Sequence, residues 1–410
     1  MLLGLVGFVG LLAAWDLVVR VGRRGPEFVS LVLLAFAGLH MMAATPNLVV
    51  IFIGLETASI AFYVIAGFMR NQEGSEESSL KYFLLGSLAS ALFLYGIALT
   101  FGATGSLTVY GANSIRNFFV GDIITEPGIL LAGMALMLVG LAFKVSAAPF
   151  HQWAPDVYQG APSGAVGLMA AGVKVAGFAA IGRIFVGGLI SQIDTWAPIF
   201  AVVAALSMIV GTVLALVQTD LKRLLAYSGV AHAGYILTGL VAGVEGIPPM
   251  WFYLATYSFM VVGSFAVVSV VSGPTSSSSP LARYSGLAKR NPELGWLMAV
   301  LILGMSGIPF FAGFVSKILT FSAAASVQNP WPAGAQGYIW LVVIGTITTV
   351  IGFAFYLRVI STMFAGDADG EEVSASLSAR FAIVISAAVT VIFGIVPWPL
   401  IDVVRDALPL

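Results

Sequence analysis

Long apolar runs recur along this whole sequence, and they constrain its fold more than any other feature. A helix that crosses a bilayer needs about 20 apolar residues, and by that measure the chain has about twelve such segments. They lie near 1–22, 27–44, 47–69, 80–102, 128–147, 163–188, 197–217, 222–242, 248–272, 293–326, 337–364 and 380–404. Only 9% of the 410 residues are charged, against about 25% in soluble domains. The sequence therefore predicts an all-α polytopic membrane protein.

The composition also excludes several kinds of site. The net charge of −1 offers no basic surface for nucleic acid, and the absence of cysteine excludes disulfides, thiolate metal sites and iron–sulfur clusters. Three histidines, His40, His151 and His232, lie too far apart to suggest metal ligation. Residues 1–19 have neither a basic flank nor a cleavage site, so we expect a retained first helix rather than a signal peptide.

Proline interrupts two of the predicted spans. Pro149 lies within the segment 141–162 and removes a helical hydrogen bond there. The span 293–326 is too long for one straight crossing and contains Gly-Ile-Pro-Phe at 307–310. Non-helical backbone at membrane depth must be satisfied by protein or by a water-filled cavity. Transporters place ion sites at such broken helices in both halves of the chain, so we expect an ion site at each break.

Basic residues concentrate in alternate loops, which predicts the orientation in the membrane. The loops on one side contain Arg20, Arg23, Arg24, Arg70, Lys222, Arg223, Arg283, Lys289, Arg290 and Arg380. The loops on the other side contain no basic residue except Arg116, which lies in the 103–127 loop. We therefore expect both termini outside. Two polar segments, 273–280 and 366–372, are expected to be flexible, solvated linkers inside.

Few charges remain within the apolar segments, and they are candidates for a proton relay: Glu56, Lys144, Lys174 and Lys317. A lysine at the centre of a membrane helix costs about 2.5–3.5 kcal/mol, so several are unusual in a purely structural bundle. Burial disfavours a charged amine and a nearby carboxylate favours it, so a buried lysine can exchange a proton where an arginine cannot. Alternatively, Glu56 could lock two helices by pairing with a lysine, and Lys317 could hold free carbonyls at its break.

Further polar residues have two possible interpretations each. Lys81 could be an anchor in the first turn of its helix or the partner of Glu56. His232, alone on an apolar helix, could be a hydrogen-bonded core residue or an extension of the relay. His151 and Asp156 could brace the first break or transfer protons.

Three sequence motifs resemble one protein family. The run Pro-Phe-His-Gln-Trp-Ala-Pro-Asp-Val-Tyr-Gln-Gly-Ala-Pro at 149–162 closely resembles the signature of antiporter-like subunit N of proton-pumping NADH:quinone oxidoreductase, respiratory complex I. Residues 219–228 and 304–314 are similar to two further segments of that family. The last segment is shared with sister subunits L and M and with multi-subunit cation/proton antiporters. The similarity extends from about Pro26 to the C-terminus.

The resemblance implies an all-helical fold with two inverted five-helix repeats, each containing one broken helix. The repeats would span 26–188 and 196–365, with an N-terminal helix in 1–25 and a C-terminal helix in 380–404. It implies a translocase subunit without redox chemistry or a cofactor of its own, in the bacterial plasma (inner) membrane. Its partners would be the lipid bilayer, antiporter-like subunit M and the small subunits K and J.

By motif position, the resemblance assigns a proton path to six residues: Glu56, Lys81, Lys144, Lys174, His232 and Lys317. A proton would enter from the inside, reside on Lys144, pass through Lys174 to Lys317 and leave outside, with Glu56 modulating Lys144 through an ion pair. Two alternatives remain. One is a subunit of an Mrp-type cation/proton antiporter, and the other is a structural connector that does not pump.

Overall fold

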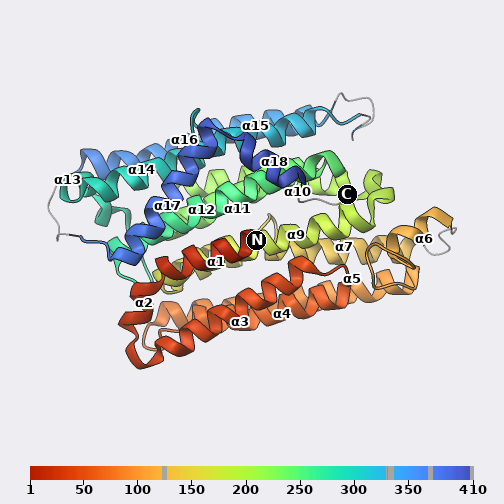
Figure 1. The fold of residues 1–410 in the computed structure, drawn as a ribbon, viewed down its shortest axis with the longest axis horizontal. Helices are drawn as coiled ribbons and strands as arrows, with labels where there is room; N and C mark the ends of the chain where they lie inside the picture. The colour runs from red at the N-terminus through yellow and green to blue at the C-terminus, as the bar shows by residue number, and fades with distance from the viewer. Residues whose placement is uncertain (122–126, 329, 331–336, 368–372, 407–410) are drawn as a thin grey trace.

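The computed structural model describes residues 1–121, 127–328, 330, 337–367 and 373–406. Within these residues the regular structure is helical, apart from isolated bridges that pair Asn47 with Thr108 and Asp220 with Pro280. Most of the helices run roughly along one direction, as a bundle (Figure 1). The predicted all-α fold is confirmed.

Nine helices in the described residues are long and apolar enough to cross a membrane. They are α3 (Gly25–Ala44), α4 (Leu48–Ala66), α5 (Glu73–Thr104), α7 (Pro127–Lys144), α9 (Ser163–Ile181, continued by the π-helix Gly182–Gly188), α10 (Ile193–Leu216), α12 (Ile247–Ser272), α16 (Ile339–Ala365) and α17 (Leu377–Ile395). The twenty-residue helix α11 (Leu221–Leu240) is more polar. Shorter apolar helices are α1 (Leu2–Ala13), α14 (Pro292–Ser306) and α15 (Ala312–Ala325). The chain is therefore a multi-pass membrane protein.

Several short helices complete the described chain. They are α2 (Trp15–Arg20), α6 (Ile115–Gly121), α8 (Trp153–Gly160), α13 (Leu287–Arg290) and α18 (Trp398–Asp406). The single C-terminal helix expected at 380–404 is divided between α17 and α18, with Pro397 between them. Proline lacks the backbone N–H that a continuous helix would need there.

Both predicted breaks are present. The first separates α7 from α8, and the second separates α14 from α15. Lys144 is the last residue of α7, so that helix ends before Pro149 rather than at it. Ser146 and Gly307, which follow α7 and α14, have φ angles of 60° and 84°. A left-handed residue cannot continue a right-handed helix, and this explains where each first half ends.

The start of α5 differs from the prediction. The helix begins at Glu73, so Lys81 lies in its third turn rather than its first. Polar residues fill the first two turns, and a hydropathy criterion therefore places the start too late. Glu73 and Glu76 lie in the first turn, where negative charge interacts favourably with the helix dipole.

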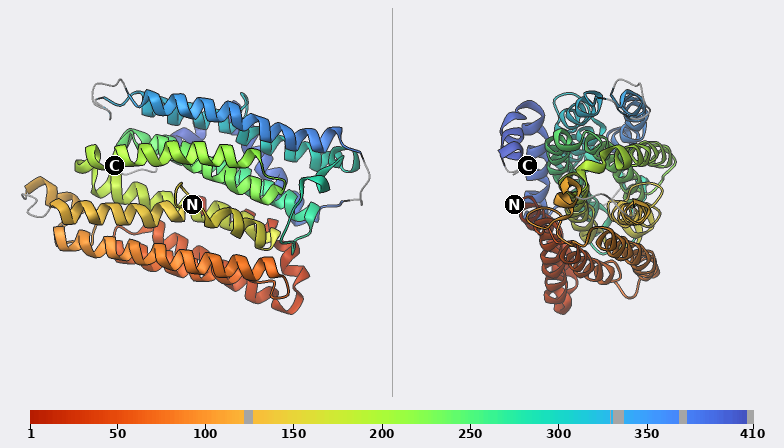
Figure 2. Two further views of the ribbon diagram at one scale, coloured as in Figure 1. Left: turned by 180° about the vertical axis from the view of Figure 1, so that it is seen from behind. Right: turned by 90° about the vertical axis from the view of Figure 1, so that its right-hand side faces the viewer.

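Helices α9 and α11 form the centre of the bundle. Every residue of Ser163–Ile181 is buried, and so is every residue of α11 except Arg223. Helix α9 contacts α1, α3 and α12, while α11 contacts α8, α10, α12 and α15. Glycine and alanine dominate α9, and small residues allow neighbouring helices to approach closely in membranes. The end-on view in Figure 2 shows the surrounding helices, with α1 and α17 on one side.

The two broken helices run in opposite directions. The end of α8 lies beside the start of α11, as the hydrogen bond from Lys222 Nζ to the Ala161 carbonyl shows. The start of α14 lies at the same end of the bundle, where Lys289 bonds the carbonyl of Gly366. We call the end of the bundle that contains Lys222 and Lys289 the basic end. Opposite directions are what an inverted repeat requires, while the repeat boundaries at 26–188 and 196–365 stay a prediction.

The segment 273–280 is mostly partly exposed, but it is not the flexible linker that its composition suggests. Its carbonyls at Pro274 and Ser276 accept hydrogen bonds from Gly164 N and Ser163 Oγ, both at 3.0 Å. Ser279 is fully buried, and its carbonyl accepts from Leu221 N at 2.8 Å. The expected flexibility is wrong, because composition does not reveal these distant hydrogen-bond partners. Most of the other expected linker, 366–372, lies outside the described residues.

The orientation can be tested with single cysteines, because the chain has none of its own. Ala282 lies exposed at the basic end and Ala112 lies exposed in the loop after α5. A membrane-impermeant maleimide should label Ala282→Cys only in inside-out vesicles and Ala112→Cys only in right-side-out vesicles, because basic loops stay inside. The reverse labelling pattern would show that the basic end faces outward.

Candidate functional site

Lys144 lies at the first break with a neutral hydrogen-bond partner. It is 3% exposed, and its Nζ donates to Ser59 Oγ on α4 at 2.7 Å. Ser59 Oγ in turn donates to the carbonyl of Leu55 at 2.5 Å. The ammonium also lies 5.7 Å from the ring centroid of Tyr82, over its face. The charge of Lys144 is therefore held by a hydroxyl and an aromatic ring.

Glu56 lies on α4, three residues before Ser59, so both side chains fall on neighbouring positions of one helix face. The glutamate is partly buried, and its Oε1 is buried without a hydrogen-bond partner among the described residues. No ion pair joins Glu56 to Lys144 in the described part of the chain. Instead of the expected ion pair with Glu56, Lys144 bonds Ser59, which lies on the same helix as Glu56.

A small cavity lies beside Lys144. Tyr63, Ser90 and Phe143 contribute to its lining. Its volume of about 10 Å³ is close to the minimum that holds one water molecule. Most of the lining is apolar, and the polar side chains of Tyr63, Ser90 and Lys144 offer such a water hydrogen-bond partners.

Lys174 reaches the same break from the central helix α9. It is 2% exposed, and its Nζ donates to the Val145 carbonyl at 2.7 Å. Val145 directly follows α7, where the last carbonyls of a helix lack intrahelical partners. The residue whose carbonyl binds Lys174 thus directly follows Lys144 in the chain.

A polar cluster continues from Lys174 into the second half of the chain. Gly229 of α11 faces Lys174 so closely that a Cβ there would lie 3.7 Å from the lysine Cε and 3.0 Å from the Tyr257 hydroxyl. One turn away, His232 is hydrogen-bonded through Nδ1 to Tyr253 Oη at 2.8 Å and through Nε2 to Tyr356 Oη at 3.2 Å.

The Tyr356 hydroxyl joins two residues of α11. It is hydrogen-bonded both to Ser228 Oγ and to His232 Nε2. His232 is 1% exposed, and both of its ring nitrogens have hydroxyl partners. Hydroxyls can donate and accept, so this cluster can carry a proton in either direction.

Lys317 donates to a backbone carbonyl at the second break, as Lys174 does at the first. It is 5% exposed, and its Nζ donates to the Ser306 carbonyl, the last of α14, at 3.0 Å. Its ammonium lies 4.6 Å from the ring centroid of Tyr235. A second cavity of about 10 Å³, again near one water in size, borders Lys317, His232 and Tyr356.

Lys81 lies apart from this series. Its side chain is 41% exposed, and its Nζ contacts Asp156 at 2.8 Å and Glu77 at 2.6 Å. The interpretation of Lys81 as the partner of Glu56 is therefore wrong. His151 lies within the break, with its Nδ1 buried and unpartnered among the described residues.

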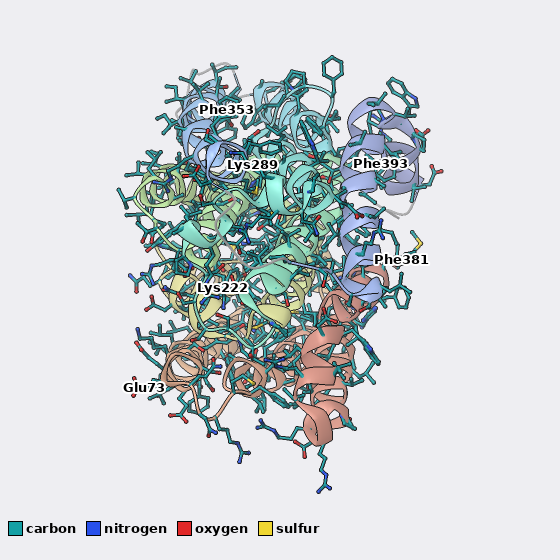
Figure 3. The ribbon with its side chains drawn as sticks, turned by 90° about the vertical axis from the view of Figure 1, so that its left-hand side faces the viewer. Glu73, Lys222, Lys289, Phe353, Phe381 and Phe393 are labelled. Atoms are coloured by element: carbon teal, nitrogen blue, oxygen red, sulfur yellow. The ribbon has the colours of Figure 1, made fainter. Side chains whose placement is uncertain are left out.

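Sequence reasoning missed Ser59 and Lys222. The spacing of Ser59 from Glu56 is the only local signal for its role. The sequence predicts Lys222 in a basic loop, yet it is fully buried, and its Nζ donates to the carbonyls of Ala161 at 2.6 Å and Ser276 at 2.9 Å. Figure 3 views the basic end and shows Lys222 within the bundle and Phe381 at its edge. Its sequence neighbours are Leu221 and Arg223, so the local sequence gives no signal that it is buried.

The described residues contain no group of three or more histidine, aspartate or glutamate side chains that could hold a metal ion. The candidate site there consists of lysines, hydroxyls, backbone carbonyls and one histidine.

Known proteins are similar to this chain in both sequence and fold. Residues 45–352 match a family described as NADH:quinone oxidoreductase/Mrp antiporter, transmembrane. The chain is 41% identical over 397 residues to NADH-quinone oxidoreductase subunit N of Mycobacterium tuberculosis (strain H37Rv), covering 95% of this chain and 72% of that protein. It is 38% identical over 388 residues to subunit N 1 of Chloroherpeton thalassium, covering 93% and 78%.

Solved structures of two complexes contain chains with a similar fold. A chain of respiratory complex I from Thermus thermophilus with bound aureothin superposes with a TM-score of 0.80 at 36% identity, over 98% of this chain and 85% of that one. A chain of the Mrp complex from Dietzia sp. has a TM-score of 0.84 at 20% identity, over 99% and 82%, and shows the fold alone. The chain therefore belongs to the NADH-quinone oxidoreductase subunit N family, within the wider NADH:quinone oxidoreductase/Mrp antiporter family.

Proposed function

We propose that this chain translocates protons across the bacterial plasma membrane as a membrane-arm subunit of an NADH:quinone oxidoreductase. Electron transfer in other subunits would drive it, and the chain would carry no cofactor of its own. The similarity to subunit N proteins and to a chain of a respiratory complex I supports this assignment. Its neighbours would be subunit M and the small subunits K and J.

One observation carries the proposal: three buried lysines follow one another through the bundle, each held by neutral oxygen. Lys144 donates to a serine hydroxyl, Lys174 to a carbonyl of the first break and Lys317 to a carbonyl of the second. None of the three pairs with a carboxylate in the described residues. A lysine in such a place can release its proton without leaving a buried carboxylate unpaired, which would cost several kcal/mol.

The contacts suggest the order of transfer. A proton from the basic end would reach Lys144 and pass by way of the break to Lys174. From there the Ser228, Tyr356 and His232 cluster would carry it to the second cavity and Lys317, which lies in the half-helix that runs away from the basic end. One water in each cavity would supply a mobile link where side chains do not touch.

Glu56 would modulate the first step. Its charge lies on the same helix face as Ser59, which binds Lys144. Coulomb attraction from a partly buried carboxylate favours the protonated form of a nearby lysine, and that attraction falls with distance. A shift of α4 relative to α7 would therefore change how readily Lys144 releases its proton.

Lys144→Arg tests proton transfer at the first break, because arginine keeps the charge but does not release a proton at physiological pH. We expect proton translocation per NADH oxidised to fall in membrane vesicles, since loss of a positioned proton-transfer group typically costs about 10²-fold or more in rate. Lys144→Ala should do the same. Native gels would confirm that the complex assembles.

The matched control is Lys289→Ala, which removes an exposed lysine at the basic end and should leave the ratio unchanged. Normal pumping by Lys144→Arg would mean that Lys144 only braces the break and that this subunit is a scaffold.

Tyr356→Phe tests the link between the halves. It removes the hydroxyl shared by Ser228 and His232 and keeps the ring, so we expect slower proton translocation with little change in assembly. Tyr284→Phe is the control, because that tyrosine is also buried and bonds Ser279 Oγ at 2.7 Å, at the basic end. Each variant loses two hydrogen bonds, and one such bond is worth about 1 kcal/mol. Equal pumping by the two variants would contradict the role of Tyr356.

A further inference from the structure

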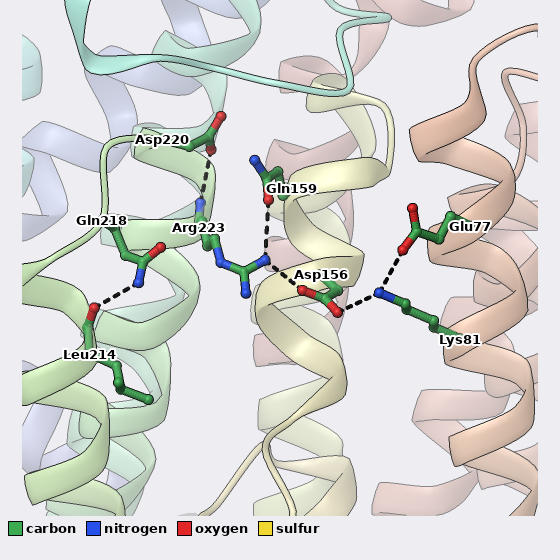
Figure 4. A network of polar contacts seen from close by, with 8 residues as sticks. All are labelled: Glu77, Lys81, Asp156, Gln159, Leu214, Gln218, Asp220 and Arg223. Atoms are coloured by element: carbon green, nitrogen blue, oxygen red, sulfur yellow. Dashed lines mark hydrogen bonds and ion pairs between the residues drawn. The ribbon is translucent and has the colours of Figure 1, made fainter.

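Asp156 holds two cations from two different helices. Its Oδ2 accepts from Lys81 Nζ of α5 at 2.8 Å, and its Oδ1 accepts from Arg223 Nη1 of α11 at 2.5 Å. The aspartate itself lies on α8, the second half of the first broken helix. Figure 4 shows this arrangement, with α8 between the two neighbouring helices. We call Lys81, Asp156 and Arg223 the α8 clamp.

Further contacts extend the clamp on both sides. Arg223 Nη1 also donates to Gln159 Oε1, one turn along α8, at 3.2 Å. Lys222, the next residue of α11, donates to the Ala161 carbonyl just after α8. On the other side, Lys81 also pairs with Glu77 of its own helix. Helix α11 is thus bound to two residues of α8 and to the residue that follows it.

Helix α8 needs such ties because it has only eight residues. Helices shorter than about 12 residues are marginal on their own, so neighbours must hold them. On its α5 side, Trp153 stacks on Tyr82 with ring centroids 4.5 Å apart, and its Nε1 donates to the Phe143 carbonyl at 2.9 Å. The clamp and this stack together fix where the second half-helix lies.

The position of α8 determines the geometry of the break that precedes it. Residues 145–152 connect α7 to α8, and this connection contains the Val145 carbonyl that binds Lys174. Lys144 ends the preceding helix. A displacement of α8 would therefore move the group that separates the two lysines.

We propose that Asp156 is a positioning residue that ties the first break to α11, the helix that carries His232. Movement of α11 would pull α8 through Arg223, and α8 would change the alignment of Lys144 with Lys174. This assigns Lys81 to the clamp rather than to the path of the proton itself. The inference rests on the proposed proton path and adds how its two halves are mechanically linked.

Asp156→Asn in the intact complex tests the proposal, with hydrogen–deuterium exchange of peptides spanning 145–162 as the first measurement. Exchange should accelerate by about two- to fivefold for each lost ion pair, the range expected for partly exposed pairs. Protons translocated per NADH oxidised should fall at the same time. Asp156→Glu keeps the charge and should recover most of both properties.

Glu293→Gln is the matched control, because it breaks the exposed ion pair of Glu293 with Arg380, 2.6 Å long, between α14 and α17. It should alter neither exchange at 145–162 nor pumping. Lys81→Met and Arg223→Met should each give a partial effect. Adding Lys81→Met to Asp156→Asn should give no further effect, because the other partner of Lys81, Glu77, lies on its own helix. If Asp156→Asn prevents assembly, these two variants carry the test.

Unchanged exchange in Asp156→Asn would overturn the clamp. Faster exchange with normal pumping would overturn the positioning role, because α8 would then move without affecting the lysines. Failure of the proton path itself would be seen separately, as normal pumping by Lys144→Arg, while the exchange measurement still reports whether the clamp exists.

Discussion

The hydrogen bond from a lysine ammonium to a carbonyl freed by a helix break is the interaction on which this structure depends. An interrupted helix leaves carbonyl oxygens without partners, and in lipid each unsatisfied group costs several kcal/mol. Lys174 satisfies Val145 at the first break, and Lys317 satisfies Ser306 at the second. The break therefore stabilises the buried charge, and the charge stabilises the break. Neither feature would be tolerable in the membrane without the other.

The two halves of the chain surround these lysines differently. The first half offers Lys144 a serine and the ring of Tyr82, with Glu56 on the same helix as the serine. The second half surrounds His232 with tyrosines from α12 and α16, whose hydroxyls complete a continuous hydrogen-bonded cluster. A repeated backbone arrangement thus supports an electrostatic site in one half and a hydroxyl network in the other.

Local signals in the sequence were enough to predict the breaks and the buried lysines. Proline within an apolar run and lysine at a helical position are each visible in a few residues, and the structure places Lys144, Lys174 and Lys317 at those breaks. The partners were not predictable, because they come from remote segments: Lys144 and Ser59 are 85 residues apart, and Lys81 and Asp156 are 75 apart. Hydropathy likewise could not reveal that α5 starts in a polar stretch.

Lys222 has a consequence for the order in which the protein is made. Its two acceptors lie 61 residues before it, at Ala161, and 54 residues after it, at Ser276. When the ribosome has just completed α11, only the first acceptor exists, and the ammonium still needs water or lipid headgroups for its remaining protons. The second hydrogen bond can form only after α12 has been synthesised and the following segment has returned to the same end of the bundle.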